Sequence, residues 1–437
     1  MQTPPWHARL LFVAALLAVP LTASTAPKDA VERKLITAVR KSDDKAFKLL
    51  EQIVNINSGT LNTEGVRQVA DVVAPHFEAL GFSVRWEDGK SYGRAGHLIA
   101  ERAGRGPHVL LIGHLDTVFE REHPFQRYQR QGDKAIGPAT ADMKGGIVVA
   151  LAALEAMHAQ RVLEDLRITV VLHGDEEDAG TPIESARATL VQAAEAADIA
   201  IGLENADDDP KTAVVARRSS SRWQLKVSGT SAHSSQIFTE QVGAGAIYEL
   251  ARILHRFYEE LRGEDYLTFN PGLIAGSTQL DYSSEPLRAE TFGKDNIVAP
   301  EAVASGDLRA ITLQQREQTK ERMRKIVSDN LPGTRATIEF DDGYPPMAPT
   351  EGNKNLLTMY DEVSRDLGFG PVTAVDPRKA GAADVSFAAD HVDMAIDGLG
   401  LLGGDSHTPQ EFADLTSFQT QTQRLAVLLY RLGKGKK

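Results

Sequence analysis

Residues 109–118 read VLLIGHLDTV, and this stretch decides the fold. Its four leading apolar residues are typical of a buried strand, and polar side chains follow at once. Similar short runs occur at residues 82–86, 168–172 and 199–203. They alternate with helical patterns such as residues 143–160, and this alternation predicts a mostly parallel sheet covered by helices, an α/β fold class.

Six acidic or histidine side chains lie at or next to the ends of apolar segments: His114, Asp116, Asp142, Glu176, Glu177 and Glu204. His407 follows far down the chain in a Gly-rich loop. Ligands of parallel sheets gather at the carboxyl ends of the strands, and His114, Glu176, Glu177 and Glu204 each fall just past one of those ends. Divalent ions bind carboxylate oxygen and imidazole nitrogen, and the set is therefore typical of a two-metal centre.

Taken singly, these side chains also have structural interpretations. His114 and Asp116 stand two apart on an extended segment, so both leave the same face and could form a buried structural pair. Asp142 precedes a helical run and could be its N-cap, since Asp is a favoured capping residue. Glu176 and Glu177 could lie in an exposed acidic turn. Only the whole set favours a metal centre.

The composition narrows the possible functions. The chain has 437 residues, 42% of them hydrophobic and 25% charged, which is typical of a globular protein with two or more domains. Its formal net charge of -12 argues against nucleic-acid binding, because such proteins concentrate Lys and Arg on a surface. Cysteine is absent, so any metal must be bound by nitrogen and oxygen ligands.

The N-terminal residues have the pattern of a secretory signal peptide. Arg9 precedes an apolar run at residues 10–21, and small residues follow at 22–26. A run of about twelve apolar residues is too short to span a bilayer, so residues 1–26 are predicted to be a signal peptide without stable membrane insertion. An uncleaved anchor is the alternative. We expect the protein to work in the periplasm or outside the cell.

A second domain is predicted within the first. From Arg218 on, strands are predicted near residues 223–227, 267–278, 297–310 and 335–340, with helices near 242–262 and 314–330. The order β-α-β-β-α-β is typical of a ferredoxin-like α+β unit. Helix and strand alternation then resumes and carries His407, so residues 218–341 are predicted to be an inserted domain. Residues 27–217 and 342–437 together form the main domain.

Together the motifs resemble those of one family, the di-zinc peptidases and deacylases. That family includes carboxypeptidase G, which the chain resembles most in type, aminoacylase, acetylornithine deacetylase and succinyl-diaminopimelate desuccinylase. The resemblance spans about residues 35–430. It rests on His-x-Asp at 114–116, Asp-Met-Lys-Gly-Gly at 142–146, Glu-Glu at 176–177, Glu204 and His407.

The resemblance implies a role for each of these residues and makes the main domain catalytic. The implied metal ligands are Asp142 as the bridge between two Zn²⁺ ions, His114 and Glu204 in one set, and Glu177 and His407 in the other. Glu176 is implied to be the general acid and base. Asp116 is implied to orient His114 from behind.

The inserted domain carries three further candidates. Residues 229–234, GTSAHS, resemble the family segment whose histidine reaches across a dimer to polarise the scissile carbonyl, which implies that His233 acts in the partner subunit of a homodimer. Arg309 and Asn270 resemble positions that hold a substrate carboxylate, and a guanidinium fork suits that role. The alternatives are a histidine on a surface hairpin and an arginine on a surface strand. Residues 379–384, KAGAAD, have fewer glycines than the similar family loop, which affects substrate fit.

These observations predict a secreted or periplasmic zinc-dependent amide hydrolase that acts on peptides or N-acyl amino acids. A carboxypeptidase that releases a C-terminal residue, with glutamate as a candidate, is favoured. A broad-specificity aminoacylase or dipeptidase is the alternative. From another class, the chain could be a non-catalytic binding protein on the same fold. Neither Glu176 nor any candidate metal ligand is missing from the sequence, which favours an enzyme.

Overall fold

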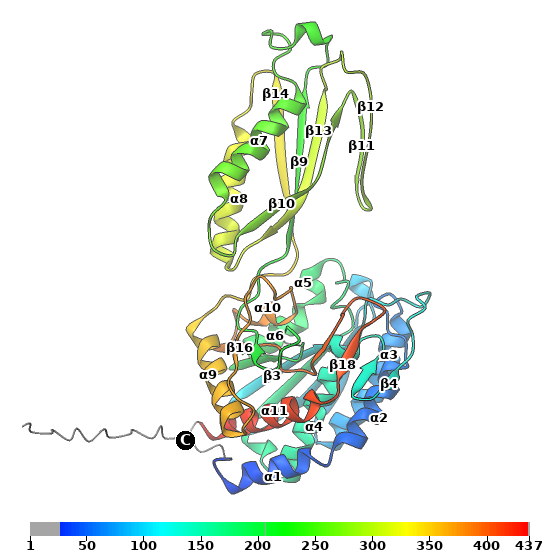
Figure 1. Cartoon of the computed structure of the whole chain (residues 1–437), viewed down its shortest axis with the longest axis vertical. Helices are drawn as coiled ribbons and strands as arrows, with labels where there is room; N and C mark the ends of the chain where they lie inside the picture. Colours follow the sequence, from blue (N-terminus) through cyan, green and yellow to red (C-terminus); the bar gives the residue numbers. More distant parts are fainter. Residues whose placement is uncertain (1–26, 206, 436–437) are drawn as a thin grey trace, which may run out of the picture.

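The computed structural model describes residues 27–205 and 207–435. The predicted signal peptide lies outside these residues. The molecule is elongated, with a broad helix-covered part below a narrow part in which helices line one side of a sheet (Figure 1). Within the two described ranges, no helix is long and apolar enough to cross a membrane.

The main domain is built on a six-stranded sheet with the order β1-β2-β6-β3-β7-β16. Its strands are β1 (Ser83–Asp88), β2 (Gly96–Arg102), β3 (His108–His114), β6 (Arg167–His173), β7 (Ile199–Gly202) and β16 (Met394–Ile396). β3 pairs parallel with β6 and β7, and β16 pairs parallel with β7, whereas β1 and β2 add an antiparallel edge. The predicted α/β class with a mostly parallel sheet is confirmed.

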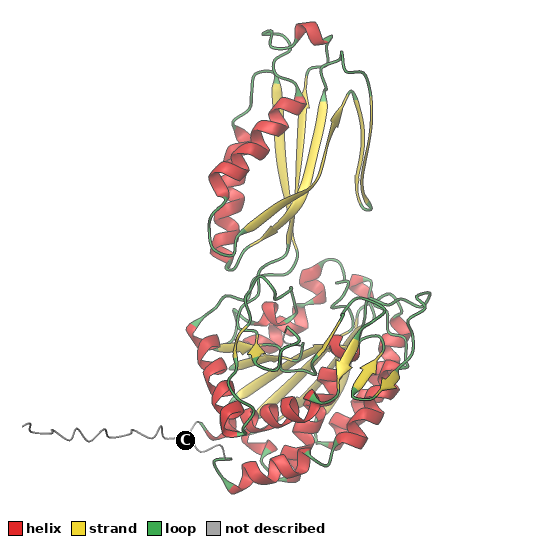
Figure 2. Ribbon diagram, viewed as in Figure 1, coloured by secondary structure: helices red, strands yellow, loops and turns green. Residues whose placement is uncertain are grey.

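Helices cover both faces of this sheet (Figure 2). One layer holds α1 (Ala30–Val39), α2 (Asp43–Val54), α3 (Thr63–Ala79), α4 (Gly145–Ala159), α9 (Glu351–Asp366) and α11 (Ser417–Lys434). The opposite layer holds α6 (Ala188–Glu195) and α10 (Val385–Ala388), and the short α5 (Ile183–Ala186) precedes α6. The side chains of successive strand residues point to opposite faces of the sheet. Leu98 therefore packs in the hydrophobic core under the first helical layer, and Ile99 packs in the core under the second.

A small antiparallel sheet joins two loops that are distant in sequence. It has the order β17-β18-β5-β4, with β4 (Gln129–Gln131), β5 (Lys134–Ile136), β17 (Gly403–Gly404) and β18 (Phe412–Asp414). Because β5 pairs with β18, the loop that follows β5 lies beside the loop between β17 and β18. These two loops carry Asp142 and His407. A parallel pair, β8 (Thr212–Ala213) and β15 (Thr373–Ala374), lies elsewhere in the main domain.

The inserted domain has the predicted ferredoxin-like order. Its elements are β9 (Ser221–Gly229), α7 (Ala246–Leu261), β10 (Thr268–Ser277), β13 (Glu301–Arg309), α8 (Leu313–Ser328) and β14 (Thr334–Asp342). They form an antiparallel sheet with the order β10-β13-β9-β14. Trp223, Leu225 and Val227 alternate along β9 and bury one face of the sheet against the two helices. The hairpin of β11 (Gln279–Ser284) and β12 (Leu287–Phe292) is an addition that the sequence pattern did not indicate.

The chain passes between the two sheets twice, and the two passes run side by side. The backbone of Arg217 pairs with that of Met347 in an isolated antiparallel bridge. Further along, the Ser220 N–H donates to the carbonyl of Tyr344 at 2.9 Å, and the Gly343 N–H donates to the carbonyl of Ser220 at 3.0 Å. The inserted domain therefore connects to the main domain through a paired, hydrogen-bonded segment.

Candidate metal centre

His114 ends β3 and is fully buried. Its Nδ1 lies 3.2 Å from Asp116 Oδ1, and Asp116 Oδ2 accepts a hydrogen bond of 2.7 Å from the Thr60 hydroxyl. Asp116 also accepts the backbone N–H groups of Glu176 and Glu177, both at 3.1 Å. Asp116 therefore fixes the ring of His114 from behind, as a carboxylate does for a metal-ligating histidine, and holds the next acidic segment beside it.

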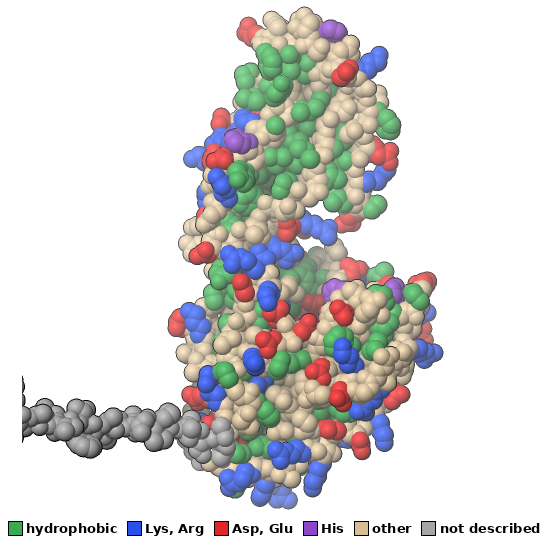
Figure 3. All heavy atoms as spheres, in the orientation of Figure 1, with side chains coloured by type: hydrophobic (Ala, Val, Ile, Leu, Met, Phe, Trp, Pro, Cys, Tyr) green, Lys and Arg blue, Asp and Glu red, His purple; other side chains and the backbone are tan. Residues whose placement is uncertain are grey.

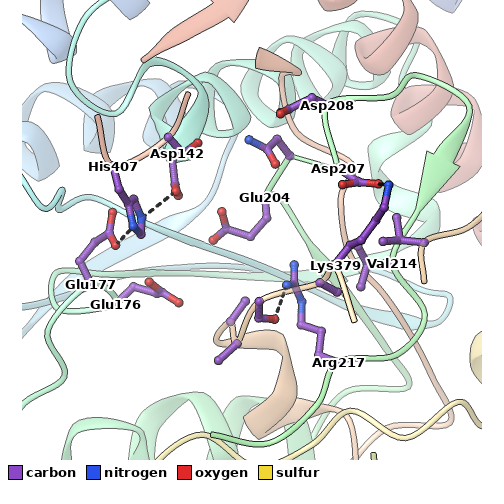
Figure 4. Close-up of a pocket in the computed structure, with 17 residues that line it drawn as sticks. Asp142, Glu176, Glu177, Glu204, Asp207, Asp208, Val214, Arg217, Lys379 and His407 are labelled. Carbon is purple, nitrogen blue, oxygen red and sulfur yellow. Dashed lines mark hydrogen bonds and ion pairs between the residues drawn. The ribbon is translucent and has the colours of Figure 1, made fainter. Parts of the chain in front are cut away.

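Two sets of side chains could each hold a metal ion, and Asp142 belongs to both. In the first set, His114 Nε2 lies 3.3 Å from Asp142 Oδ1 and 3.5 Å from Glu204 Oε1. In the second, His407 Nε2 lies 3.2 Å from Asp142 Oδ2 and 3.2 Å from Glu177 Oε2. Figure 4 shows four of these side chains directed into one space. The structure thus brings together all five candidate ligands, which we call the metal-ligand cluster.

Asp142 lies in a non-helical turn rather than at a helix cap. Its backbone angles are φ -117° and ψ 86°, and α4 begins only at Gly145, without a side-chain cap. The N-cap interpretation of Asp142 is therefore wrong. The turn is held by the buried carboxylate of Glu411, which accepts three backbone N–H groups at 3.0 to 3.1 Å, from Ala139, Ala141 and Asp142.

Glu411 also ties this turn to the loop of His407. The Gly137 N–H donates to the carbonyl of Glu411 at 3.2 Å, and the Glu411 N–H donates to the carbonyl of Thr408 at 3.0 Å. Burial, with a further contribution from the charge of Asp142, raises the pKa of Glu411 to about 8. Glu411 was not a candidate from the sequence. Its only local signal is its place four residues after His407, which does not reveal the N–H groups that it meets.

Glu204 follows β7 and is held by a buried ion pair. Its backbone N–H donates to Asp397 Oδ1 at 3.3 Å, and Asp397 Oδ2 lies 2.8 Å from Arg217 Nη2. Arg217 also donates to the carbonyl of Gly381 at 2.6 Å. Neither Arg217 nor Asp397 was a candidate from the sequence, because their separation along the chain hides the pairing.

Glu176 lies beside the metal-ligand cluster in a cavity of about 340 Å³ (Figure 4). The same cavity is lined by Asp142, Glu177, Glu204 and His407, and by the cationic side chains of Arg217 and Lys379. The backbone carbonyl of Glu176 accepts a hydrogen bond of 2.8 Å from the Tyr344 hydroxyl. Burial, together with nearby carboxylates, raises the pKa of Glu176 well above its usual range.

The metal-ligand cluster carries more negative than positive charge. Burial raises the pKa of Glu177 and of Glu204. Hydrogen bonds to Asp142 and Glu177 raise the pKa of His407 to about 11, so a proton on this ring partly offsets the carboxylates. Among the described residues, Glu177 Oε1 is buried without a hydrogen-bond partner. Buried, unsatisfied oxygen and nitrogen atoms in this arrangement fit two divalent cations.

A second buried group of charges, which we call the arginine network, lies directly behind Glu176. Arg187 Nη1 lies 2.8 Å from Asp175 Oδ1, and Arg187 Nε lies 2.7 Å from Asp384 Oδ1. Asp384 is also paired with His173, and Arg187 Nη2 donates to the Tyr344 hydroxyl at 2.9 Å. Asp384 ends the 379–384 loop noted in the sequence. The network thus connects that loop, the segment before Glu176 and the connection to the inserted domain.

The structure does not bring the three candidates of the inserted domain to the metal-ligand cluster. His233 is exposed, and its Nδ1 lies 2.9 Å from the hydroxyl of Ser235. Asn270 and Arg309 lie on the paired strands β10 and β13, and Arg309 Nε donates to Asp307 Oδ2 at 3.0 Å. None of these three side chains lines the cavity.

Comparison with known proteins places this geometry in context. Residues 110–431 match the model of a family described as peptidase family M20/M25/M40. Carboxypeptidase G2 of Pseudomonas sp. (strain RS-16) is 26% identical over 449 residues, which cover 97% of this chain and 98% of that protein.

Solved structures share the fold at lower sequence identity. Aminopeptidase PepT of Bacillus cereus superposes with a TM-score of 0.69 at 16% identity, covering 89% of this chain and 98% of that one. The YXEP protein of Bacillus subtilis, described as a dinuclear metal-binding peptidase, superposes with a TM-score of 0.63 at 14% identity, covering 90% of this chain and 99% of that one.

Proposed function

The chain belongs to peptidase family M20/M25/M40, a family of metallopeptidases, and from this premise we propose that it is a zinc-dependent carboxypeptidase of the periplasm or the cell exterior. The observation that carries the proposal is the pair of ligand sets that share Asp142 beside Glu176 in one cavity. The bond cleaved is an amide next to a free carboxylate, in peptides or N-acyl amino acids.

In this proposal, some side chains of the cavity bind the metal ions and others position those ligands. Two divalent ions, Zn²⁺ in this proposal, would be held by His114, Asp142 and Glu204 and by Asp142, Glu177 and His407. When bound, such ions supply Lewis acidity toward the scissile carbonyl and lower the pKa of water. Asp116 keeps the ring of His114 in place and aligns the segment of Glu176 and Glu177.

Glu176 is the general base and then the general acid. Its carboxylate accepts a proton from the attacking water and returns it to the leaving amine. A pKa raised by burial suits this double use, because proton transfer is most effective when the pKa lies near the working pH. The hydrogen bonds of Asp116 and Tyr344 to its backbone keep the carboxylate in the cavity.

The inserted domain completes the site in this proposal. Arg309 and Asn270 hold the carboxylate of the substrate, since a guanidinium fork matches a carboxylate. His233 polarises the scissile carbonyl in the partner subunit of a homodimer. Its ring is exposed and does not line the cavity of its own chain, which supports a role outside that chain.

A hydrolysis panel tests the proposal. The full-length protein is given N-acyl amino acids and dipeptides, with and without a chelator, and the Glu176→Gln variant is the control. We expect chelator-sensitive release of a C-terminal residue, with glutamate among the favoured residues, and loss of turnover in the variant. Cleavage of many unrelated side chains would support the broad aminoacylase or dipeptidase instead. Binding without cleavage would support the non-catalytic alternative.

Subunit mixing tests the role of His233. The Glu176→Gln and His233→Ala variants are expected to be inactive separately, but a mixed dimer combines one intact Glu176 with an intact His233 from the partner. Recovery of activity after the two are exchanged supports the proposal. Full activity of a monomer would contradict it. N-terminal sequencing of the protein recovered from a periplasmic fraction tests the location.

A further inference from the structure

Three of the five candidate ligands are held by carboxylates that follow strands of the central sheet. Asp116, shortly after β3, lies 3.2 Å from the ring of His114 and accepts the backbone N–H of Glu177 at 3.1 Å. Asp397, directly after β16, accepts the backbone N–H of Glu204 at 3.3 Å. Neither Asp116 nor Asp397 belongs to a ligand set. The sheet therefore positions these three ligands through two buried aspartates.

The other two ligands, Asp142 and His407, come from loops outside that sheet, and the side chain of Glu411 holds the first of these loops. Glu411 Oε1 accepts the N–H of Ala141 at 3.0 Å and that of Asp142 at 3.1 Å. Its Oε2 accepts the N–H of Ala139 at 3.1 Å. Only 1% of Glu411 is exposed, so this carboxyl group is directed to the backbone of the turn rather than to solvent.

The backbone of Glu411 holds the second loop. Its N–H donates to the carbonyl of Thr408 at 3.0 Å and closes the turn that directly follows His407. Its carbonyl accepts the N–H of Gly137 at 3.2 Å, at the start of the segment that leads to Asp142. One residue therefore ties the two loops together and fixes the separation between Asp142 and His407.

His407 has no carboxylate behind its ring, unlike His114. Its ion pairs, with Asp142 and Glu177, are both made by Nε2 (Figure 4). In the part of the chain that the structure describes, no hydrogen bond reaches its Nδ1. The side chain is 57% exposed, and the backbone φ of 63° lies in the left-handed region. The ring therefore takes its position from the loop backbone that Glu411 fixes.

We propose that Glu411 is a positioning residue that assembles the second ligand set, by setting the separation between Asp142 and His407. The inference rests on the proposed function, in which two divalent ions are bound. The second set takes two of its three ligands from loops held by Glu411, whereas the first set takes only the shared Asp142. Loss of the Glu411 carboxylate should therefore weaken the ion of the second set more than the other ion.

A loss of charge alone would act differently. Glu411→Gln also removes a carboxylate near both ligand sets, but Asp and Glu side chains are already gathered on the main domain below the inserted domain (Figure 3). Coulomb energy falls slowly with distance, so the loss of one charge should weaken both ions alike. Displacement of Asp142 and His407 should weaken one ion selectively. Selectivity is therefore the signature of the positioning role.

The experiment is a zinc titration of the metal-free, full-length protein. Free Zn²⁺ is set by a metal buffer, and the zinc bound per chain is counted by mass spectrometry. The wild type should bind two ions, and Glu411→Gln should raise the Kd of one of them by about 10- to 100-fold, the usual effect of a residue that orients a ligand. The amide has the size of the carboxyl group, but its NH2 faces N–H groups that already donate. Unchanged Kd values would overturn the proposal, whereas a wild type that binds no zinc would contradict the proposed function.

Double variants show which ion is weakened. Glu204→Ala removes a ligand from the first set and His407→Ala removes one from the second, so each should bind one ion. Glu411→Gln should weaken the ion that Glu204→Ala retains by about 10- to 100-fold. It should change the ion that His407→Ala retains much less. Equal weakening in both backgrounds, or the reverse order, would overturn the proposal.

Glu249→Gln is the matched control. Glu249 is fully buried, and its carboxylate also accepts a backbone N–H, from Leu331 at 3.1 Å, but it lies on α7 of the inserted domain. This variant should keep both Kd values of the wild type. Glu411→Asp keeps the carboxylate with a shorter reach and should weaken the same ion by less than Glu411→Gln does. If Glu411→Gln does not fold, as judged by circular dichroism, an unchanged Kd in Glu411→Asp overturns the proposal.

Discussion

The arginine network and the metal-ligand cluster are neighbours, yet they bury charge in opposite ways. In the arginine network, the guanidinium of Arg187 meets Asp175 and Asp384, and its remaining donors go to backbone and Tyr344. In the metal-ligand cluster, three carboxylates meet two imidazoles, and among the described residues none of the three forms an ion pair with arginine or lysine. The carboxylates of one group face a guanidinium, and those of the other face only imidazoles.

We interpret the arginine network as a structural use of buried charge and the metal-ligand cluster as a functional one. An ion pair that is satisfied from both sides holds chain segments in register, and removal of one partner leaves an unpaired buried charge. In the metal-ligand cluster, burial and neighbouring carboxylates raise the pKa values of Glu177 and Glu204, and such shifts are typical of functional sites. Carboxylates are buried without a guanidinium or ammonium partner in the metal-ligand cluster, where an ion can be bound, whereas Asp175, two residues before Glu177, is paired with Arg187.

The largest effect, on turnover, is expected from Glu176→Gln. This variant tests whether the cavity that contains the metal-ligand cluster is catalytic. The variant should lower kcat by about 10²- to 10⁴-fold, because general acid–base catalysis contributes that much. Metal content, measured by mass spectrometry, should be unchanged, since Glu176 is not in either ligand set. Glu240→Gln, at an exposed site, is the control. Near-normal turnover would remove Glu176 from the mechanism.

The next largest effect, on stability, tests whether the arginine network has a structural role. Arg187→Leu should lower the free energy of unfolding by about 3–5 kcal/mol, because two buried carboxylates lose their cation. Denaturant unfolding of the metal-free protein measures it. Arg85→Leu, which breaks a half-exposed pair with Glu87, should cost at most about 1 kcal/mol. Asp142→Asn should destabilise the metal-free protein less than Arg187→Leu, because the amide keeps an oxygen for one of the two histidines beside it, and an equal loss in both variants would erase the distinction.

Metal removal should produce a smaller loss, confined to the metal-ligand cluster. Ions that bind only the folded state add about 2.7 kcal/mol when their free concentration is 100 times Kd. A chelator should therefore lower the Tm of the wild type in calorimetry. It should have little effect on Asp142→Asn, which lacks the shared ligand, and its full effect should persist in exposed-site variants such as Glu240→Gln. An equal chelator effect on both proteins would point to ions elsewhere.

The smallest effect concerns Tyr344, the contact between the two groups. Tyr344→Phe removes one hydroxyl that donates to Glu176 and accepts from Arg187, and should cost about 1 kcal/mol of stability. Tyr248→Phe, at a site 55% exposed, should cost nothing measurable. Unfolding curves of the two variants, recorded side by side, make the comparison. No difference between them would show that the link is not needed.

The fold class and the five candidate ligands could be predicted from local sequence patterns. The strands at 109–112, 168–172 and 199–203 are short apolar runs, and polar side chains follow them directly. β2 was missed, although it lies between β1 and β6 in the same sheet. The β11–β12 hairpin was missed because its residues are largely exposed and carry no clear apolar alternation.

Pairings between distant residues could not be predicted. Arg187 and Asp384 are 197 positions apart, and Glu411 is 269 positions from Asp142, to whose N–H it bonds. Each of these side chains alone has many possible partners. The partner is chosen by strand order and by the pairing of β5 with β18, neither of which leaves a signal at the residue itself.

The sequence by itself determined which chemistry is available: carboxylate and imidazole ligands, no thiolate, and the positions of His114, Glu177 and Glu204 shortly after apolar runs. Only the tertiary structure decided how the charges are shared. It paired Arg187 with Asp384 and, among the described residues, gave Asp142 two imidazoles as its ion-pair partners. The physical reason is that electrostatic energy depends on distances in space and on burial, whereas periodicity along the chain reports only local packing.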